Sequence, residues 1–167
     1  TIQEKRKKLK GLTLAYVGDG NNVANSLIQA CVKVGMHFSI ASPHGYELDA
    51  AVMRQAKAEG KQTTAKVLAT NDPFHAVRNA DVVYTDVWAS MGQEAEHAKR
   101  MKAFKGYEVD AKLMKTARRG ALVMHCLPAH RNEEIAAEVI DGPQSVIFDQ
   151  AENRLHVQKA LLDMLLG

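Results

Sequence analysis

Hydrophobic and polar positions divide this chain into two kinds of segment. Short, dense apolar runs with the length of buried strands alternate with longer stretches in which apolar residues recur at helical spacing. The strands predicted from these runs are 12–17, 36–41, 64–69, 81–85, 121–124 and 145–148. The helices predicted between and after them are 23–34, 48–59, 74–79, 93–104, 110–117, 133–140 and 152–166.

This alternation predicts an α/β fold with a doubly wound, mainly parallel sheet and helices on both faces, in a Rossmann-like three-layer arrangement. With 167 residues and a hydrophobic content of 46%, the chain has enough apolar surface for a single core. We therefore predict a charged helical or linker lead-in at 1–11, followed by one domain at 12–167.

Polar segments follow several of the predicted strands. In a parallel sheet with right-handed crossovers, every strand ends at the same edge. We therefore expect four of these segments to converge on one crevice that binds a small ligand. They are 18–22, 71–73, 86–92 and 125–131.

Charge and cysteine content narrow the classes of partner. Residues 1–10 hold five basic and one acidic side chain, and the rest of the chain is close to neutral. This local basic segment, without a base-stacking aromatic motif, argues against a nucleic-acid partner. No apolar run approaches the roughly 20 residues of a membrane span, and the two cysteines form no C-x-x-C pair, which favours a reducing compartment. We expect a cytoplasmic protein, with the mitochondrial matrix as the alternative.

The glycine turn at 18–23 begins like a dinucleotide-binding fingerprint. Val23, however, occupies the position of the third glycine, and the second predicted strand runs into Ala-Ser-Pro at 41–43, which offers no acid for a ribose. We therefore expect no nicotinamide cofactor. The adjacent amides of Asn21 and Asn22, beside a helix N-terminus, can instead hold a carboxylate.

Asp86 directly follows a predicted buried strand, and Ser90 and Met91 lie in the loop after it. An aspartate at this place can cap a helix, and a methionine can fill a gap in the core. A carboxylate here can equally bind an ammonium group. Both interpretations of Asp86 stay open on the residues alone.

Cys126 follows another predicted strand and is a candidate nucleophile. A thiol nucleophile needs a base, but His125 should point to the opposite side of the strand, and His130 can reach the thiol only through the turn. A small buried apolar residue is the commoner role for a lone cysteine. We also expect no zinc site, because these three residues lack a second ligand pair at the usual spacing.

Five motifs together resemble the ornithine carbamoyltransferases in their order and spacing. The resemblance covers nearly the whole chain but only the second, ornithine-binding half of that enzyme. His-Cys-Leu-Pro and Ser-Met-Gly favour the ornithine family over its aspartate relative. The motifs are GDGNN at 18–22, TNDP at 70–73, DVWASMG at 86–92, HCLPAHR at 125–131 and AENR at 151–154.

The resemblance implies a binding role for several residues. Asn22 would bind the α-carboxylate of L-ornithine, and Asp86, Ser90 and Met91 would hold its α-amino end. These implied roles agree with the carboxylate and ammonium chemistry that the residues themselves favour.

The resemblance also implies the reaction, in which the neutral δ-amine attacks the carbamoyl carbon and phosphate is expelled, leaving L-citrulline. Cys126 and Leu127 would lie beside the reacting groups, with Cys126 positioning them rather than forming a covalent bond, and Arg154 would contact carbamoyl phosphate. Cys126 and Arg154 are thus the expected catalytic residues, and neither cofactor nor metal is expected.

One feature of the family does not occur in this sequence. There is no Ser-Thr-Arg-Thr-Arg segment, which binds phosphate in the first half of such enzymes. We therefore expect carbamoyl phosphate to bind mainly through that half, this chain alone to be inactive, and the full enzyme to be a homotrimer. The alternatives are a transcarbamoylase for a related amine or amino acid and a non-catalytic amino-acid-binding module.

Overall fold

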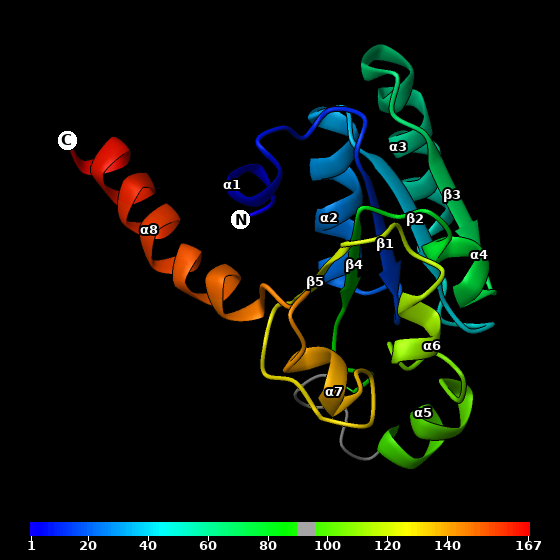
Figure 1. Cartoon of the computed structure of the whole chain (residues 1–167). Coiled ribbons are helices and arrows are strands. Elements are labelled where there is room, and N and C mark those ends of the chain that lie inside the picture. Colours follow the sequence, from blue (N-terminus) through cyan, green and yellow to red (C-terminus); the bar gives the residue numbers. More distant parts are fainter. Residues whose placement is uncertain (90–95) are drawn as a thin grey trace.

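A parallel sheet forms the centre of the chain (Figure 1). The computed structural model describes residues 1–89 and 96–167. Within this part, the sheet has five strands in the order β3-β2-β1-β4-β5, and every neighbouring pair is parallel. The predicted α/β class is thereby confirmed. The strands are β1 Thr13–Val17, β2 His37–Ala41, β3 Val67–Thr70, β4 Val82–Thr85 and β5 Leu122–His125.

Helices pack on both faces of this sheet. Buried residues of α2 and α3 join one apolar cluster, and buried residues of α4, α6 and α7 join the other. An aspartate or asparagine side chain caps the N-terminus of α2, α3, α4 and α6, which explains locally where these helices begin. The helices are α1 Ile2–Arg6, α2 Asn22–Lys33, α3 Ala50–Thr63, α4 Pro73–Val77, α5 His97–Ala103, α6 Ala111–Met114, α7 Ala137–Ile140 and α8 Ile147–Leu166.

The central strands are apolar on both sides, as expected for a sheet covered by two layers of helices. Along β1, Leu14 and Tyr16 face the cluster under α2 and α3, whereas Ala15 and Val17 face the opposite cluster. All four side chains are buried. The dense apolar runs of the sequence therefore reflect burial on two faces.

The predicted sixth strand at 145–148 is wrong. Ser145 forms a single parallel bridge with Val123, and α8 already begins at Ile147, which is fully buried. A short apolar run cannot be assigned to a strand or to the buried first turn of a helix by periodicity alone. The helix predicted at 133–140 is also shorter, because 131–135 form a turn closed by a bridge between Arg131 and Ile135.

The last helix, α8, leaves the body of the molecule after its first turns (Figure 1). Its start is held by Ile147 in the core and by Asn153, which donates hydrogen bonds to Thr1 and Glu4 in the lead-in. Farther along, α8 exposes the large apolar side chains Leu155, Leu161, Leu162, Met164, Leu165 and Leu166. Among the described helices, none combines the length and apolar composition needed to cross a membrane.

Candidate functional site

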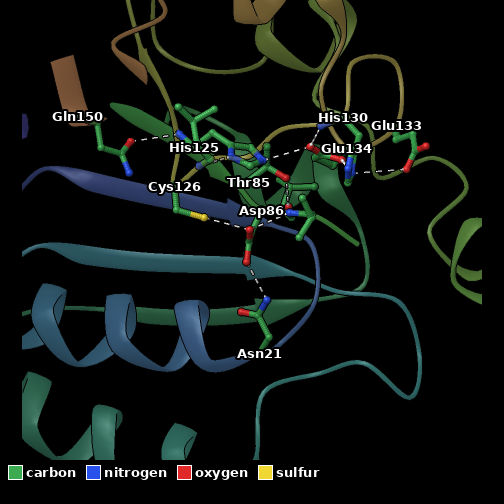
Figure 2. A network of polar contacts seen from close by, with 12 residues as sticks. Asn21, Thr85, Asp86, His125, Cys126, His130, Glu133, Glu134 and Gln150 are labelled. Carbon is green, nitrogen blue, oxygen red and sulfur yellow. Dashed lines mark hydrogen bonds and ion pairs between the residues drawn. The ribbon is translucent and has the colours of Figure 1, made fainter. Parts of the chain in front are cut away.

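Three neighbouring strands end at the same level of the sheet. In the parallel register, Val17 of β1 lies beside Thr85 of β4, and Thr85 lies beside His125 of β5. The residues that come next, the 18–22 turn, Asp86 and Cys126, consequently meet at one edge (Figure 2). The predicted convergence of strand exits is confirmed for these three segments.

The fourth segment, 71–73, does not join them. It follows β3, the outer strand, which is separated from β1 by β2. Asn71 there donates a hydrogen bond of 2.7 Å to the Ser42 carbonyl, and Asp72 caps α4. The prediction that all four segments form one crevice is wrong for this one, because it did not include the order of the strands in the sheet.

Asp86 is the centre of the site and is 6% exposed. Its Oδ1 accepts hydrogen bonds from the Cys126 thiol at 3.0 Å and the Val87 amide at 2.8 Å, while its Oδ2 accepts one of 2.9 Å from Asn21 Nδ2. Figure 2 shows this carboxylate between the thiol and the amide. Asp86 caps none of the described helices, so it joins the ends of three strands rather than starting a helix.

The two adjacent amides have different tasks. Asn21 caps α2, because its Oδ1 accepts from the amides of Val23 at 3.0 Å and Ala24 at 3.2 Å while its Nδ2 reaches Asp86. Both ends of that side chain are thus engaged within the protein. Asn22 is exposed at the N-terminus of α2 and lines the cleft described below. Of the pair, Asn22 is therefore the residue placed to meet a ligand.

Cys126 is held as a neutral thiol. Burial, together with the hydrogen bond and charge of Asp86, raises the pKa of Cys126 to about 12. A nucleophilic cysteine needs the opposite, a depressed pKa and a neighbouring base. His125 does not serve as that base: its side chain is turned to Glu134, in agreement with the prediction that adjacent strand residues point apart.

This thiol can be tested by its rate of alkylation with iodoacetamide between pH 7 and 10. At pH 7, the lower thiolate fraction, partly offset by the greater nucleophilicity of a high-pKa thiolate, should make Cys126 roughly 30- to 100-fold slower than a cysteine in the unfolded chain. The rate should rise with pH through the whole range, because the pKa of about 12 lies above it. Asp86→Asn should lower that pKa and accelerate the reaction.

Cys31 provides the internal control for this experiment. Burial alone raises the pKa of Cys31 to about 12, and Asp86 is not among the causes. Mass spectrometry of the two tryptic peptides should show acceleration at Cys126 only. Equal acceleration at both cysteines would mean that Asp86→Asn loosens the fold, and no acceleration at Cys126 would contradict the role assigned to Asp86.

The sequence did not indicate that Glu134 belongs to this region. Glu134 is fully buried, and its Oε1 accepts hydrogen bonds from the His130 amide at 2.6 Å and from His125 Nε2 at 3.2 Å (Figure 2). The Leu127 amide donates to His125 Nδ1 at 2.8 Å, which leaves Nε2 as the protonated nitrogen. These hydrogen bonds among Glu134, His125 and the backbone hold the turn that places Cys126 and Leu127 at the cleft. The only sequence signal was a carboxylate next to the apolar Ile135.

A cleft of about 850 Å³ opens beside Asp86 and Cys126. Polar groups lie along part of its wall and aliphatic side chains along the rest, a combination suited to a small ligand with charged groups on an aliphatic chain. The cleft is lined by Asn22, Val23, Asp86, Val87, Ala89, His97, Cys126, Leu127, Pro128, His130 and Glu133.

The structure thus brings together four residues singled out in the sequence: Asn22, Asp86, Cys126 and Leu127. Ser90 and Met91 lie outside the described residues. Arg154 is exposed within α8, several residues after the start of that helix, and is not among the residues that line the cleft. Its expected place at the beginning of the last helix is wrong, because α8 begins at Ile147.

Fold and site together define the class of protein. A parallel sheet with the order 3-2-1-4-5 reverses its direction of growth between β1 and β4, and ligands bind at such a switch point, beyond the carboxyl ends of the strands. The cleft lies there. The chain is therefore a domain of the doubly wound α/β class, with a cleft at the place where this class binds small ligands.

The family is identified by comparison with known proteins. A family model described as "Aspartate/ornithine carbamoyltransferase, Asp/Orn binding domain" matches residues 10–165, and the chain belongs to this family. The ornithine carbamoyltransferase of Acidothermus cellulolyticus is 57% identical over 99% of this chain and 53% of its own length. That of Bacillus subtilis is 54% identical over 99% of this chain and 52% of its own length.

Solved structures agree with this assignment. The ornithine carbamoyltransferase from Pyrococcus furiosus superposes with a TM-score of 0.92 at 51% identity, over 96% of this chain and 51% of its own. That from Gloeobacter violaceus gives a TM-score of 0.91 at 49% identity, over 99% and 55%. The resemblance drawn from the motifs is confirmed, and the chain spans about half the length of these relatives.

Proposed function

We propose that this chain is the ornithine-binding half of an ornithine carbamoyltransferase, which transfers the carbamoyl group of carbamoyl phosphate to the δ-amine of L-ornithine and releases L-citrulline and phosphate. The observation that carries the proposal is the buried Asp86 carboxylate, held by Asn21 and Cys126 at the wall of a cleft with both polar and aliphatic sides. Relatives that match this chain with more than 50% sequence identity are named ornithine carbamoyltransferase.

The cleft offers a complementary group for each end of ornithine. Asp86 supplies negative charge for the α-ammonium group, aided in this proposal by Ser90 and Met91. Asn22 lies at the N-terminus of α2, where the helix dipole and its own side-chain amide favour a carboxylate. Val23, beside it, contributes an aliphatic wall for the methylene chain.

In the proposed reaction, the neutral δ-amine attacks the carbamoyl carbon and phosphate leaves from a tetrahedral intermediate. Cys126 and Leu127 lie beside the reacting groups, and the thiol positions them without forming a covalent bond, which its raised pKa of about 12 supports. Orientation and electrostatic stabilisation then supply the acceleration. Arg154, exposed on α8, is the proposed contact for carbamoyl phosphate, which would approach from the part of the relatives that this chain does not span.

The oligomeric state and the compartment of the full protein are part of the same proposal. A homotrimer in the cytoplasm is the assembly and compartment that we propose from family membership, with the mitochondrial matrix as the alternative compartment. Carbamoyl phosphate and L-ornithine are the proposed partners.

Calorimetric titration of the chain with L-ornithine tests the site. Asp86→Asn should weaken binding by roughly 30-fold or more, because it removes the charge that pairs with the α-ammonium group in a half-enclosed cleft. Asp163→Asn, on the exposed part of α8, is the matched control and should bind like the parent chain. Thermal unfolding of each variant checks that the fold is retained.

Two ligands separate the proposal from the alternative of a related amine as substrate. L-norvaline lacks the δ-amine and should still bind, whereas 1,4-diaminobutane, which is ornithine without its carboxylate, should bind far more weakly. Preference for the diamine would favour a transcarbamoylase for a related amine. Undiminished ornithine binding by Asp86→Asn would contradict the assigned role of Asp86.

A further inference from the structure

Two histidines and one glutamate that line the cleft, His97, His130 and Glu133, lie beside the buried Glu134. His130 Nδ1 lies 3.9 Å from Glu134 Oε2 and 4.0 Å from Glu133 Oε2, and the ligand atoms of these three residues all lie within 4.8 Å of one another. His97 of α5 places its Nε2 3.3 Å from Glu133 Oε2. Figure 2 shows His130, Glu133 and Glu134 side by side on the turn after β5.

One oxygen of this cluster lacks a partner. Glu134 Oε1 is used twice, by the His130 amide and by His125, but Oε2 has no hydrogen-bond donor among residues 1–89 and 96–167. The residue is fully buried, and the distance of 3.9 Å to His130 Nδ1 is too long for a hydrogen bond. Burying a carboxylate oxygen without a hydrogen-bond donor costs free energy of folding. A bound cation would satisfy this oxygen.

We propose that His130, Glu133 and Glu134 bind a divalent transition-metal ion of the Zn²⁺ class at the rim of the cleft. Zinc binds imidazole nitrogen and carboxylate oxygen at about 2.0–2.2 Å, which places two ligand atoms roughly 3.4 Å apart at the tetrahedral angle. The separations of 3.9 and 4.0 Å need to contract by only about half an ångström. The mixed nitrogen and oxygen donors favour this class over Ca²⁺ or Mg²⁺, which prefer oxygen alone.

The proposed ion fits the surrounding contacts. Glu134 can offer Oε2 while Oε1 keeps its bonds to His125 and the His130 amide. His97 can orient Glu133 as an outer partner, as is common around metal-bound side chains. The side chains of His130 and His97 are about half exposed, so the ion can enter from the cleft.

A second group of possible ligands lies near by and has to be distinguished. Asp86, His125 and Cys126 also bring ligand atoms within 4.8 Å of one another. Both ring nitrogens of His125, however, are already occupied by the Leu127 amide and Glu134. Sulfur is the chemical difference between the two groups, since only the second contains a thiol.

The test is a titration of the purified chain with Zn²⁺ in competition with a chromophoric chelator, repeated with Co²⁺ to record its absorption spectrum. We expect one bound ion, and His130→Ala or Glu133→Gln should each weaken its binding at least tenfold. Cys126→Ser should bind like the parent chain, and the Co²⁺ complex should show d–d bands without a thiolate-to-metal band. Glu134 is left unchanged in these variants because it also supports the turn.

Two further histidine variants provide a control and a test of the outer partner. His156→Ala removes an exposed histidine that lies 3.6 Å from Glu152 on α8 and should have no effect. His97→Ala should weaken binding by about tenfold if His97 orients Glu133. Absence of binding, loss of binding in Cys126→Ser with a thiolate band in the parent, or equal losses in His156→Ala and His130→Ala would each overturn the proposal.

Discussion

Replacing Glu134 with alanine should lower the free energy of unfolding of the chain by roughly 3–5 kcal/mol. The change removes the acceptor of two buried hydrogen bonds, one from the His130 amide at 2.6 Å and one from His125 Nε2 at 3.2 Å. His125 is 1% exposed, so water cannot easily replace the lost partner. Urea unfolding followed by circular dichroism, in the presence of EDTA, measures the change without a contribution from bound metal.

The matched comparisons for this variant are Glu134→Gln and Glu138→Ala. Glutamine keeps a side-chain oxygen that can accept the same hydrogen bonds, so Glu134→Gln should be clearly less destabilising than the alanine variant. Glu138 is exposed on α7, and its replacement should change the free energy of unfolding by no more than about 0.5 kcal/mol. If both alanine variants changed the free energy of unfolding by equally small amounts, the buried hydrogen bonds of Glu134 would contribute little to stability.

The Gly20→Ala variant should be destabilised by about 3 kcal/mol or more. A Cβ at this position would lie 2.4 Å from the Glu47 carbonyl carbon and 2.4 Å from the Leu48 amide nitrogen. These are backbone atoms, so no side-chain rotation relieves the clash. The Gly20 amide also donates to the Tyr46 carbonyl at 2.8 Å, which ties the turn to the same segment. The turn would have to move, and Asn21 would move with it away from Asp86.

Gly45→Ala is the control for this substitution. Gly45 has a φ of +84°, and nothing lies within 4 Å of its would-be Cβ, so the cost should be only the roughly 1–2 kcal/mol of a left-handed residue. Urea unfolding of both variants gives the comparison, and ornithine titration reports whether the displaced Asn21 disturbs the proposed site. A loss at Gly20 no larger than that at Gly45 would contradict the steric argument.

Most secondary structure could be predicted from local pattern. The alternating blocks identified all five strands of the sheet within a few residues, and the capping residues Asn21, Asp49, Asp72 and Asp110 mark helix starts that depend on neighbouring amides alone. The strand predicted at 145–148 was wrong because local pattern was its only basis. The apolar residues of this run correctly indicated burial, but a buried strand and the buried first turn of α8 have the same apolar pattern.

The candidate site divides in a similar way. The residue types at 18–22, 86 and 125–131 already indicated chemistry for an amino acid, and the five motifs together, in their order and spacing, indicated the family. The residues themselves could not decide which of the two adjacent amides faces a ligand, although the resemblance implied Asn22. The deciding contacts of Asn21 include Asp86, which is far away in the sequence. The burial of Glu134 was equally hidden, since its partner His125 is nine positions away and the turn between them has no periodic pattern.

The sequence alone was therefore enough for most of the elements, the parallel α/β class and the chemical character of the strand exits, because each depends on interactions between near neighbours in the chain. The order of the strands came only from the tertiary structure. Placing β4 between β1 and β5, and β3 at the far edge, is decided by packing between residues far apart in sequence. That packing brings Asp86, Cys126 and Asn21 into contact and leaves 71–73 outside the cleft.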